Sequence, residues 1–413
     1  MTTKTGASSV FPYNPTKWTS EPYDREELTS ELSDCLGVTR AFMLVGPRRI
    51  GKTSLLKYLE AKAREKDLLV SYVNLQESWE KSPSAEAFVE YYATSVLDDF
   101  LITAGLRQAV KYGFLRKIEW LKDHIESVKL EVVKDFVTIA VDWKEGKERT
   151  STLVRSALDL PESMAKATGK RALVLVDEFQ EITLFKQAIP NIHGLIKTRW
   201  ADHEKTSYVV TGSAIGILRS LMTEEESLFK EIFIDRMVEP FDFNTIAKFI
   251  KFVFGAVNLQ RDRAIEKLIQ EKTGGIPKWL VRITYDAYVK CRARKTRVGV
   301  QTIEKVWDDM YSFRSASYVG ADYDRDLERI SMGSKMVKRR LRSVLDAMAT
   351  TGTPTRPSEV LNNIHKKQIR MPKSALFNYL DKLVVHGLVN KVEGGVYSIV
   401  DPVLGEWLRR MSS

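Results

Sequence analysis

The stretch AFMLVGPRRIGKT, residues 41–53, decides the fold of this chain. Its first five residues form a continuous apolar run, which is typical of a parallel strand buried on both faces. The remainder fits G-x-x-x-x-G-K-[ST], a spacing at which glycines let backbone N–H groups turn inward around phosphate oxygens. A helix that starts near Gly51 carries Leu55, Leu56 and Leu59 on one face, so its positive end points at the phosphates. Strand, loop and helix in this order predict a nucleoside triphosphate site.

The residue types in this loop imply separate roles. Lys52 is expected to reach the β- and γ-phosphates, and the Thr53 hydroxyl is expected to bind Mg²⁺. The expected nucleotide-binding residues of the loop and first helical turn are Gly46, Pro47, Arg48, Arg49, Ile50, Gly51, Lys52, Thr53 and Ser54.

A pair of acids follows a second apolar run. Leu173–Val176 is followed directly by Asp177 and Glu178. Asp177 is expected to hold Mg²⁺ through water, and Glu178 to polarise the water that attacks the γ-phosphate. Acids at a strand end also suit a solvated turn, but beside a phosphate loop they predict a hydrolytic site.

A third apolar run, SYVVTGS at residues 207–213, ends in small polar residues. A hydroxyl there could touch the γ-phosphate or the attacking water, which makes Thr211 or Ser213 a candidate sensor. Residue type alone equally allows Ser213 to be the N-cap of the next helix.

Composition limits the classes to which the chain can belong. Its 413 residues, 44% apolar and 29% charged, suffice for two or three domains and exclude a mainly disordered chain. No uncharged apolar run approaches the roughly 18 residues of a membrane span, and the N-terminus does not resemble a signal peptide. Two cysteines, Cys35 and Cys291, are too few for a disulfide framework or a structural zinc site. We therefore expect a soluble, cytoplasmic protein.

Positive charge is concentrated near the C-terminal end. The chain carries 64 Lys and Arg against 54 Asp and Glu, a formal net charge of +10. Residues 335–413 hold 14 of the former and 6 of the latter, so they account for most of the excess. A basic module behind a nearly neutral body indicates an anionic partner.

The same segment has the element order of a winged helix-turn-helix, with three helices and then a hairpin at 388–400. The third helix begins at Pro372, buries one apolar stripe and leaves polar side chains outward, with basic residues in the turn before it. The candidate nucleic-acid contacts are Lys366, Lys367, Arg370, Lys373, Ser374, Asn378 and Lys382. Because phosphate contacts dominate affinity, this arrangement suits double-stranded DNA, although many winged helices bind protein instead.

Six segments together resemble the archaeal ATPase family, a P-loop group related to AAA+ and STAND ATPases. They are DREEL (24–28), GPRRIGKTSLL (46–56), LVLVDEFQEI (173–182), VVTGSAIG (209–216), TGGIPKWL (273–280) and DPVLGEWL (401–408). The DEFQ and TGGIP segments are much narrower signatures than the P-loop. The resemblance covers most of residues 23–413, apart from a helical stretch around 100–165 that looks like an enlarged insertion.

This resemblance, together with strands that alternate with helices, implies an α/β fold of the ASCE type, with one strand between the P-loop strand and the acidic strand. The expected organisation is an N-terminal arm (1–22), a P-loop ATPase core (23–240), a helical lid and linker (241–334) and a winged-helix domain (335–413). The resemblance also implies ATP and Mg²⁺ as cofactors, Ser213 as the sensor, and adenine near Arg25 and Pro277.

One departure from the family concerns the arginine that assists hydrolysis. Before the Pro240–Phe241 stop the family often has a Gly-Arg pair, whereas this chain has Lys230 and Glu231. Arg236 and Arg219 are candidate replacements, and neither matches a motif. Because an arginine finger contributes roughly 10³–10⁵ in rate, we expect hydrolysis to be slow or to depend on another subunit.

Three functions remain open from the sequence. The first is an ATP-driven switch that repositions a DNA-binding winged helix. The second is a STAND-like signalling ATPase that merely holds nucleotide and whose winged helix binds protein. A protein partner or self-association is the expected interaction in that case. The third is an origin-recognition-type initiator, which the DEFQ and TGGIP segments favour less.

Overall fold

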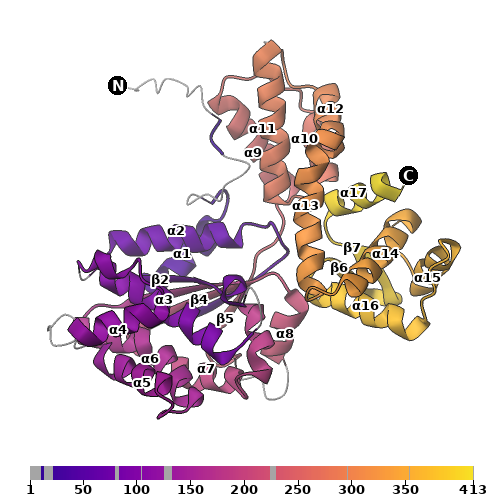
Figure 1. Ribbon diagram of the computed structural model, residues 1–413. Helices are drawn as coiled ribbons and strands as arrows, with labels where there is room; N and C mark the ends of the chain where they lie inside the picture. Colours follow the sequence, from indigo (N-terminus) through magenta and orange to yellow (C-terminus); the bar gives the residue numbers. More distant parts are fainter. Residues whose placement is uncertain are drawn as a thin grey trace, which may run out of the picture.

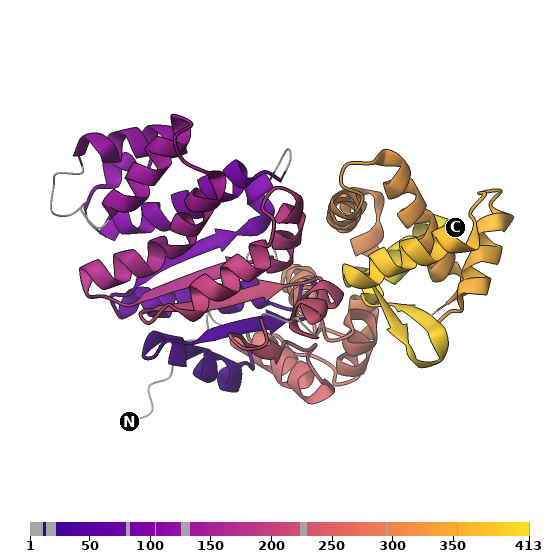
Figure 2. The ribbon, with the colours of Figure 1, turned by 90° about the horizontal axis from the view of Figure 1, so that it is seen from below.

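A computed structural model gives the arrangement in Figure 1. The structure describes residues 11–13, 22–79, 83–103, 105–124, 133–223, 229–294, 296–352 and 354–412. A sheet with its covering helices forms one lobe, and the lid and winged helix lie together beside it (Figure 2). Among the described residues, no helix is long and apolar enough to cross a bilayer.

The core is one parallel sheet. Its strands are β1 (Ala41–Val45), β2 (Leu69–Asn74), β3 (Ala172–Asp177), β4 (Thr206–Gly212) and β5 (Ile234–Met237). They run in the order β2-β3-β4-β1-β5, and every neighbouring pair is parallel. Since β4 lies between the P-loop strand β1 and the acidic strand β3, the predicted α/β fold class is confirmed.

Helices cover both faces of this sheet, which explains the uninterrupted apolar strands. Side chains alternate along β1: Phe42 and Leu44 join the core beneath α1 (Glu26–Leu32) and α2 (Lys52–Glu65). Met43 and Val45 face the opposite way into a larger core. Because both faces of the strand are buried, the side chains on each face are apolar, and the sequence of the strand is apolar throughout.

The larger core is built by the helices that follow β2, β3 and β4. They are α3 (Ala85–Thr103), α4 (Phe114–His124), α5 (Lys134–Lys144), α6 (Thr150–Thr168), α7 (Ile192–Ala201) and α8 (Ile215–Thr223). Helix α3 packs on β2 and α6 packs on β3, whereas α4 and α5 pack on one another and on these two helices. The stretch expected as an insertion thus contributes α6 to the layer that covers the sheet.

After β5 the chain becomes helical. The lid and linker helices are α9 (Phe243–Ala256), α10 (Ile265–Thr273), α11 (Pro277–Arg294), α12 (Val300–Tyr311) and α13 (Phe313–Ile330). The C-terminal elements are α14 (Lys335–Thr351), α15 (Pro357–Lys366), α16 (Lys373–Val385), β6 (Val389–Val392), β7 (Val396–Ile399) and α17 (Pro402–Ser412). Strands β6 and β7 pair antiparallel and complete the wing.

The lid and the winged helix share one hydrophobic core. Helix α17 returns from the wing to pack on α10 and α13, and the ring of Trp407 stacks on that of Tyr323, with centroids 5.7 Å apart. The part of the N-terminal arm that is described joins the same core, where Phe11 is buried against Tyr288 of α11. Because they share a core, the lid and winged helix are expected to move together.

The winged helix also contacts the ATPase core directly, where the C-terminal end of α16 meets the N-terminal end of α8. A Cβ on Gly216 would lie 3.0 Å from the Cα of Val385, and a Cβ on Gly387 would lie 2.7 Å from the carbonyl oxygen of Ser213. The two surfaces therefore meet backbone to backbone, with no room for side chains at either glycine.

This contact yields a prediction for Gly387→Ala. The φ of Gly387 is +70°, so alanine there costs about 1 kcal/mol of backbone strain and also overlaps Ser213. We expect the winged helix to separate from the core, measured as reduced energy transfer between dyes on α4 and α15. Gly394→Ala is the matched control, because φ is +80° there and no atom lies within 4 Å of the added Cβ. Equal effects of the two substitutions would show that the contact does not hold the domains together.

Candidate active site

The loop after β1 is shaped by close backbone contacts. Gly46 has no space for a side chain, since a Cβ there would lie 2.5 Å from the carbonyl oxygen of Val238. Gly51 has a φ of +101° and stands at the N-cap of α2. These two glycines let the loop curl over the positive end of the helix, which is the geometry that binds phosphate.

Lys52 lies inside this curl. Its ammonium is buried and donates hydrogen bonds to the carbonyl oxygens of Gly46 and Pro47, each at 2.8 Å. Burial lowers the pKa of Lys52 to about 8, against the opposing effect of the nearby carboxylates of Glu178 and Asp177. A triphosphate in the loop would favour the charged ammonium.

Asp177 ends β3 as the acceptor of three hydroxyl groups. Thr53 donates to Oδ2 at 2.7 Å, Tyr72 donates to Oδ2 at 2.9 Å, and Thr211 donates to Oδ1. The two residues expected to bind Mg²⁺, Thr53 and Asp177, thus touch each other. Thr211, one of the two sensor candidates, instead donates to the acid that is expected to bind Mg²⁺. Tyr72 is a further partner of this acid, and no sequence motif indicated it.

Glu178 is held by the second sensor candidate. Ser213 donates to Oε2 of Glu178 at 2.9 Å, and the amide of Gln180 donates to the same oxygen. Burial alone would raise the pKa of Glu178, but Arg48, Lys52 and these two hydrogen bonds outweigh it and lower the pKa. Glu178 is therefore an oriented carboxylate anion, as a residue that positions water must be.

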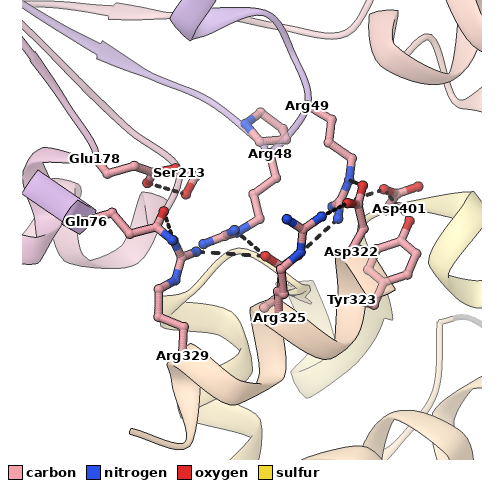
Figure 3. A network of polar contacts seen from close by, with 12 residues as sticks. Arg48, Arg49, Gln76, Glu178, Ser213, Asp322, Tyr323, Arg325, Arg329 and Asp401 are labelled. Carbon is pink, nitrogen blue, oxygen red and sulfur yellow. Dashed lines mark hydrogen bonds and ion pairs between the residues drawn. The ribbon is translucent and has the colours of Figure 1, made fainter. Parts of the chain in front are cut away.

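The side chains of Arg48 and Arg49 are directed away from the phosphate-binding curl, toward α13 and α17 (Figure 3). Arg48 pairs with Asp326, and Arg49 pairs with Asp326 at 3.1 Å and with Asp322 and Asp401 at 3.7 Å each. The guanidinium of Arg49 also lies 4.4 Å from the ring centre of Tyr323. Both arginines were expected to bind nucleotide; within the described residues their side chains bind carboxylates, which leaves their backbone for phosphate.

The two elements expected near adenine meet at Phe241. The Arg25 guanidinium lies 4.7 Å from the centre of the Phe241 ring and donates to the carbonyl oxygen of Glu239 at 2.6 Å. Gly275, just before Pro277 at the start of α11, packs so closely on Phe241 that a Cβ would lie 2.2 Å from its carbonyl oxygen. Arg25 and the TGGIP turn thus both contact Phe241, one through its ring and the other through its backbone.

Neither of the two candidate arginine fingers, Arg236 and Arg219, has a described side-chain contact with the phosphate loop. Arg236 lies on β5, and its Nε donates to Glu31 of α1 at 2.7 Å. The Arg219 side chain is outside the described residues. A different arginine, Arg329 of α13, reaches the end of β2, where it donates to Gln76 at 2.7 Å. No motif includes Arg329.

The expected nucleic-acid contacts form one exposed surface. They lie at the end of α15, in the turn that follows and along α16, and the seven residues, Lys366, Lys367, Arg370, Lys373, Ser374, Asn378 and Lys382, are all exposed. No ion pair in the described structure involves any of their charged groups.

Comparisons with known proteins agree with this geometry. A family model for an ATPase domain predominantly from Archaea matches residues 23–283. The chain is similar in structure to the Walker-type ATPase PABY2304 of Pyrococcus abyssi, with 20% identity over 97% of this chain and 99% of that one and a TM-score of 0.65. It is also similar to the ORC2 protein of Aeropyrum pernix, solved as ADPNP–ADP complexes, with 14% identity over 97% and 98% of the chains and a TM-score of 0.52.

A comparison with curated protein sequences gives no match, so the family assignment rests on the matched domain. That match spans more than half of the chain and includes the P-loop, both acids of β3, the sensor strand and the TGGIP turn. The chain belongs to the archaeal ATPase family.

Proposed function

We propose that this protein hydrolyses ATP slowly and uses its nucleotide state to position a winged helix that binds double-stranded DNA. Two parts of the proposal can fail independently. The first is turnover at the carboxyl edge of the sheet, and the second is coupling of that edge to a DNA-binding surface.

Turnover is supported by two charged groups at the carboxyl edge of the sheet, the ammonium of Lys52 and the carboxylate of Glu178. Lys52 would bind the phosphates from inside the loop. Glu178 is an anion that Ser213 holds, and it would orient the attacking water. Glu178 is the residue that takes up the proton of that water, and Ser213 positions it.

Magnesium fits the donor set. Thr53 and Asp177 lie 2.7 Å apart, and hydroxyl and carboxylate oxygens are ligands that Mg²⁺ prefers. When bound, Mg²⁺ would neutralise charge on the β- and γ-phosphates. Tyr72 and Thr211 hold the Asp177 carboxylate in place for it.

Coupling rests on one observation: the residue that holds Glu178 also touches the winged helix. The Ser213 hydroxyl donates to Glu178, and the Ser213 carbonyl lies against Gly387 at the end of α16. If nucleotide binding shifts Glu178, Ser213 would shift with it and would push on Gly387, just after α16.

DNA as the partner is supported by the exposed basic surface at the other end of α16. A DNA-binding winged helix places the start of its third helix in the major groove and anchors it through phosphates. The lysines there are free of ion pairs in the described structure, so binding need not break an internal contact.

The chemistry is tested by two substitutions. Lys52→Ala should abolish nucleotide binding, because its buried ammonium lies inside the phosphate loop, against the carbonyl oxygens of Gly46 and Pro47. Glu178→Gln should retain binding and reduce turnover at least about 10²-fold, since the amide cannot take up a proton. Isothermal titration with ATP and phosphate release measure the two effects. Unchanged turnover in Glu178→Gln would remove Glu178 from its role.

DNA binding is tested on the full chain by salt titration. Lys366→Glu and Lys373→Glu should each weaken duplex binding uniformly across sequences and reduce the slope of log K against log salt by about 1. Lys147→Glu, an exposed lysine of the ATPase lobe, is the matched control. If the wild-type chain does not bind duplex DNA even at low salt, the DNA-binding part of the proposal is wrong, and a protein partner becomes the better explanation of this surface.

The contact between winged helix and core should depend on pH through His386. Burial, Arg48 and Lys382 lower the pKa of His386 to about 4, opposed by Glu178, whereas a released histidine has a pKa of about 6.5. The released state thus binds a proton that the docked state excludes. Docking should weaken about tenfold per pH unit as pH falls from 6.5 toward 4.

The same dye pair on α4 and α15 measures this release. His386→Gln should remove the pH dependence, and the exposed His365→Gln should retain it. A pH dependence that survives in His386→Gln would assign the effect to another group.

A further inference from the structure

Arg329 of α13 is buried without enough partners. Its side chain is only 8% exposed. One nitrogen donates to Gln76, but Nε and Nη2 make no hydrogen bond within the described structure. The nearest carboxylate oxygens, of Glu181 and Asp326, are 3.8 and 4.0 Å away. Buried donors are nearly always hydrogen-bonded, so two unpaired nitrogens on one guanidinium require an explanation.

The carboxylates around Arg329 are already used by other groups. Asp326 is bound by Arg48 and Arg49, and Glu181 accepts from the amide of Gln180 at 3.4 Å. Arg48 and Arg49 each leave one buried nitrogen, Nε, without a hydrogen bond in the described structure, whereas Arg329 leaves two, Nε and Nη2. Of these three guanidinium groups, Arg329 therefore has the most unused buried donors.

Its position places these donors close to Glu178. Gln76 lies just beyond β2, whose last residue Asn74 pairs with Asp177 of β3. Gln180, which contacts Glu181 near the Arg329 guanidinium, also donates to Glu178. Figure 3 shows Arg329 rising from α13 and Arg48 descending from the loop, with Gln76, Glu178 and Ser213 on the same side.

A planar fork of N–H groups matches a phosphate, which can accept two parallel hydrogen bonds from it. The carboxylate of Glu178 would orient water beyond the γ-phosphate, so the phosphate nearest Arg329 would be the γ-phosphate. ADP lacks that group.

We propose that Arg329 is the arginine that contacts the γ-phosphate of ATP, supplied in cis by α13 of the same chain. The proposal rests on the proposed ATPase function and assigns it a further residue. It is an alternative to the two candidates from the sequence, Arg236 and Arg219, and to an arginine from another subunit.

Arg329 carries no proton or leaving group in the reaction. The water oxygen bonds to the γ-phosphorus, the bond from that phosphorus to the bridging oxygen of ADP breaks, and the water proton passes to Glu178. The guanidinium stabilises the charge that spreads over the γ-phosphate oxygens. Because α13 leads directly into α14 of the winged helix, the same contact would report ATP to that domain.

The first test is nucleotide discrimination by the full chain with Mg²⁺. Arg329→Ala should weaken binding of ATPγS by about tenfold or more and leave ADP binding within about twofold of wild type. Arg325→Ala is the matched control, because Arg325 lies one turn earlier on α13 and its side chain is 78% exposed. Equal losses for ATPγS and ADP, or none, would overturn the proposal.

The second test is turnover in mixtures. Arg329→Ala should reduce phosphate release by about 10³-fold. An equal mixture of Arg329→Ala and Glu178→Gln chains should stay inactive if the arginine acts in cis. Recovery of turnover in the mixture would show action across a subunit interface and overturn the assignment.

Two further measurements keep these outcomes separate. Arg329→Lys retains the charge beside Glu181 and is expected to fold and bind ADP, yet to lose most of the turnover, because an ammonium lacks the fork. Absence of turnover in the wild type would refute the proposed hydrolysis. The difference between ATPγS and ADP binding would still test Arg329 in that case.

Discussion

The buried guanidinium of Arg49 holds together the phosphate loop, the lid and the C-terminal helix. It faces Asp322 and Asp326 of α13 and Asp401 before α17, and it lies over the ring of Tyr323. Asp401 in turn accepts from the indole of Trp279 in the TGGIPKWL segment at 2.9 Å. Loss of one partner from such a network leaves an uncompensated buried charge, which costs far more than the intact network contributes. The loop can therefore hardly shift unless the helices shift with it.

The carboxyl edge of the sheet, which holds the candidate active site, is organised by the same parallel geometry that buries its strands. Carboxyl ends of β1, β3 and β4 lie side by side, so Lys52, Asp177, Glu178 and Ser213 converge although they are far apart in sequence. A second layer of residues then orients these groups, as Tyr72 and Thr211 do for Asp177. The winged helix packs on the end of β4 through Gly387, so the C-terminal domain contacts this edge directly as well as being connected to it through the lid.

Local sequence predicted the features that depend on local physics. The apolar run at 41–45 predicted a buried parallel strand, and the glycines after it predicted the phosphate loop. The acids after β3 also suit a solvated turn, and only the loop beside them made a hydrolytic site the better prediction. The sequence could not reveal that Arg48 and Arg49 turn to α13, because their partners come more than 270 residues later. Nor could it reveal Arg329, which lies in an ordinary amphipathic helix.

The sequence by itself determined the kind of chemistry this protein is built for, since binding phosphate needs residue types at a spacing set by the loop backbone. It also determined that positive charge gathers in residues 335–413. Only the tertiary structure decided how that chemistry is connected. Packing of the lid and the winged helix around one core brings α13 and α16 next to the candidate active site. Because a buried charge is costly without a partner, Arg49 of the loop pairs with Asp326 of α13 across the domain boundary.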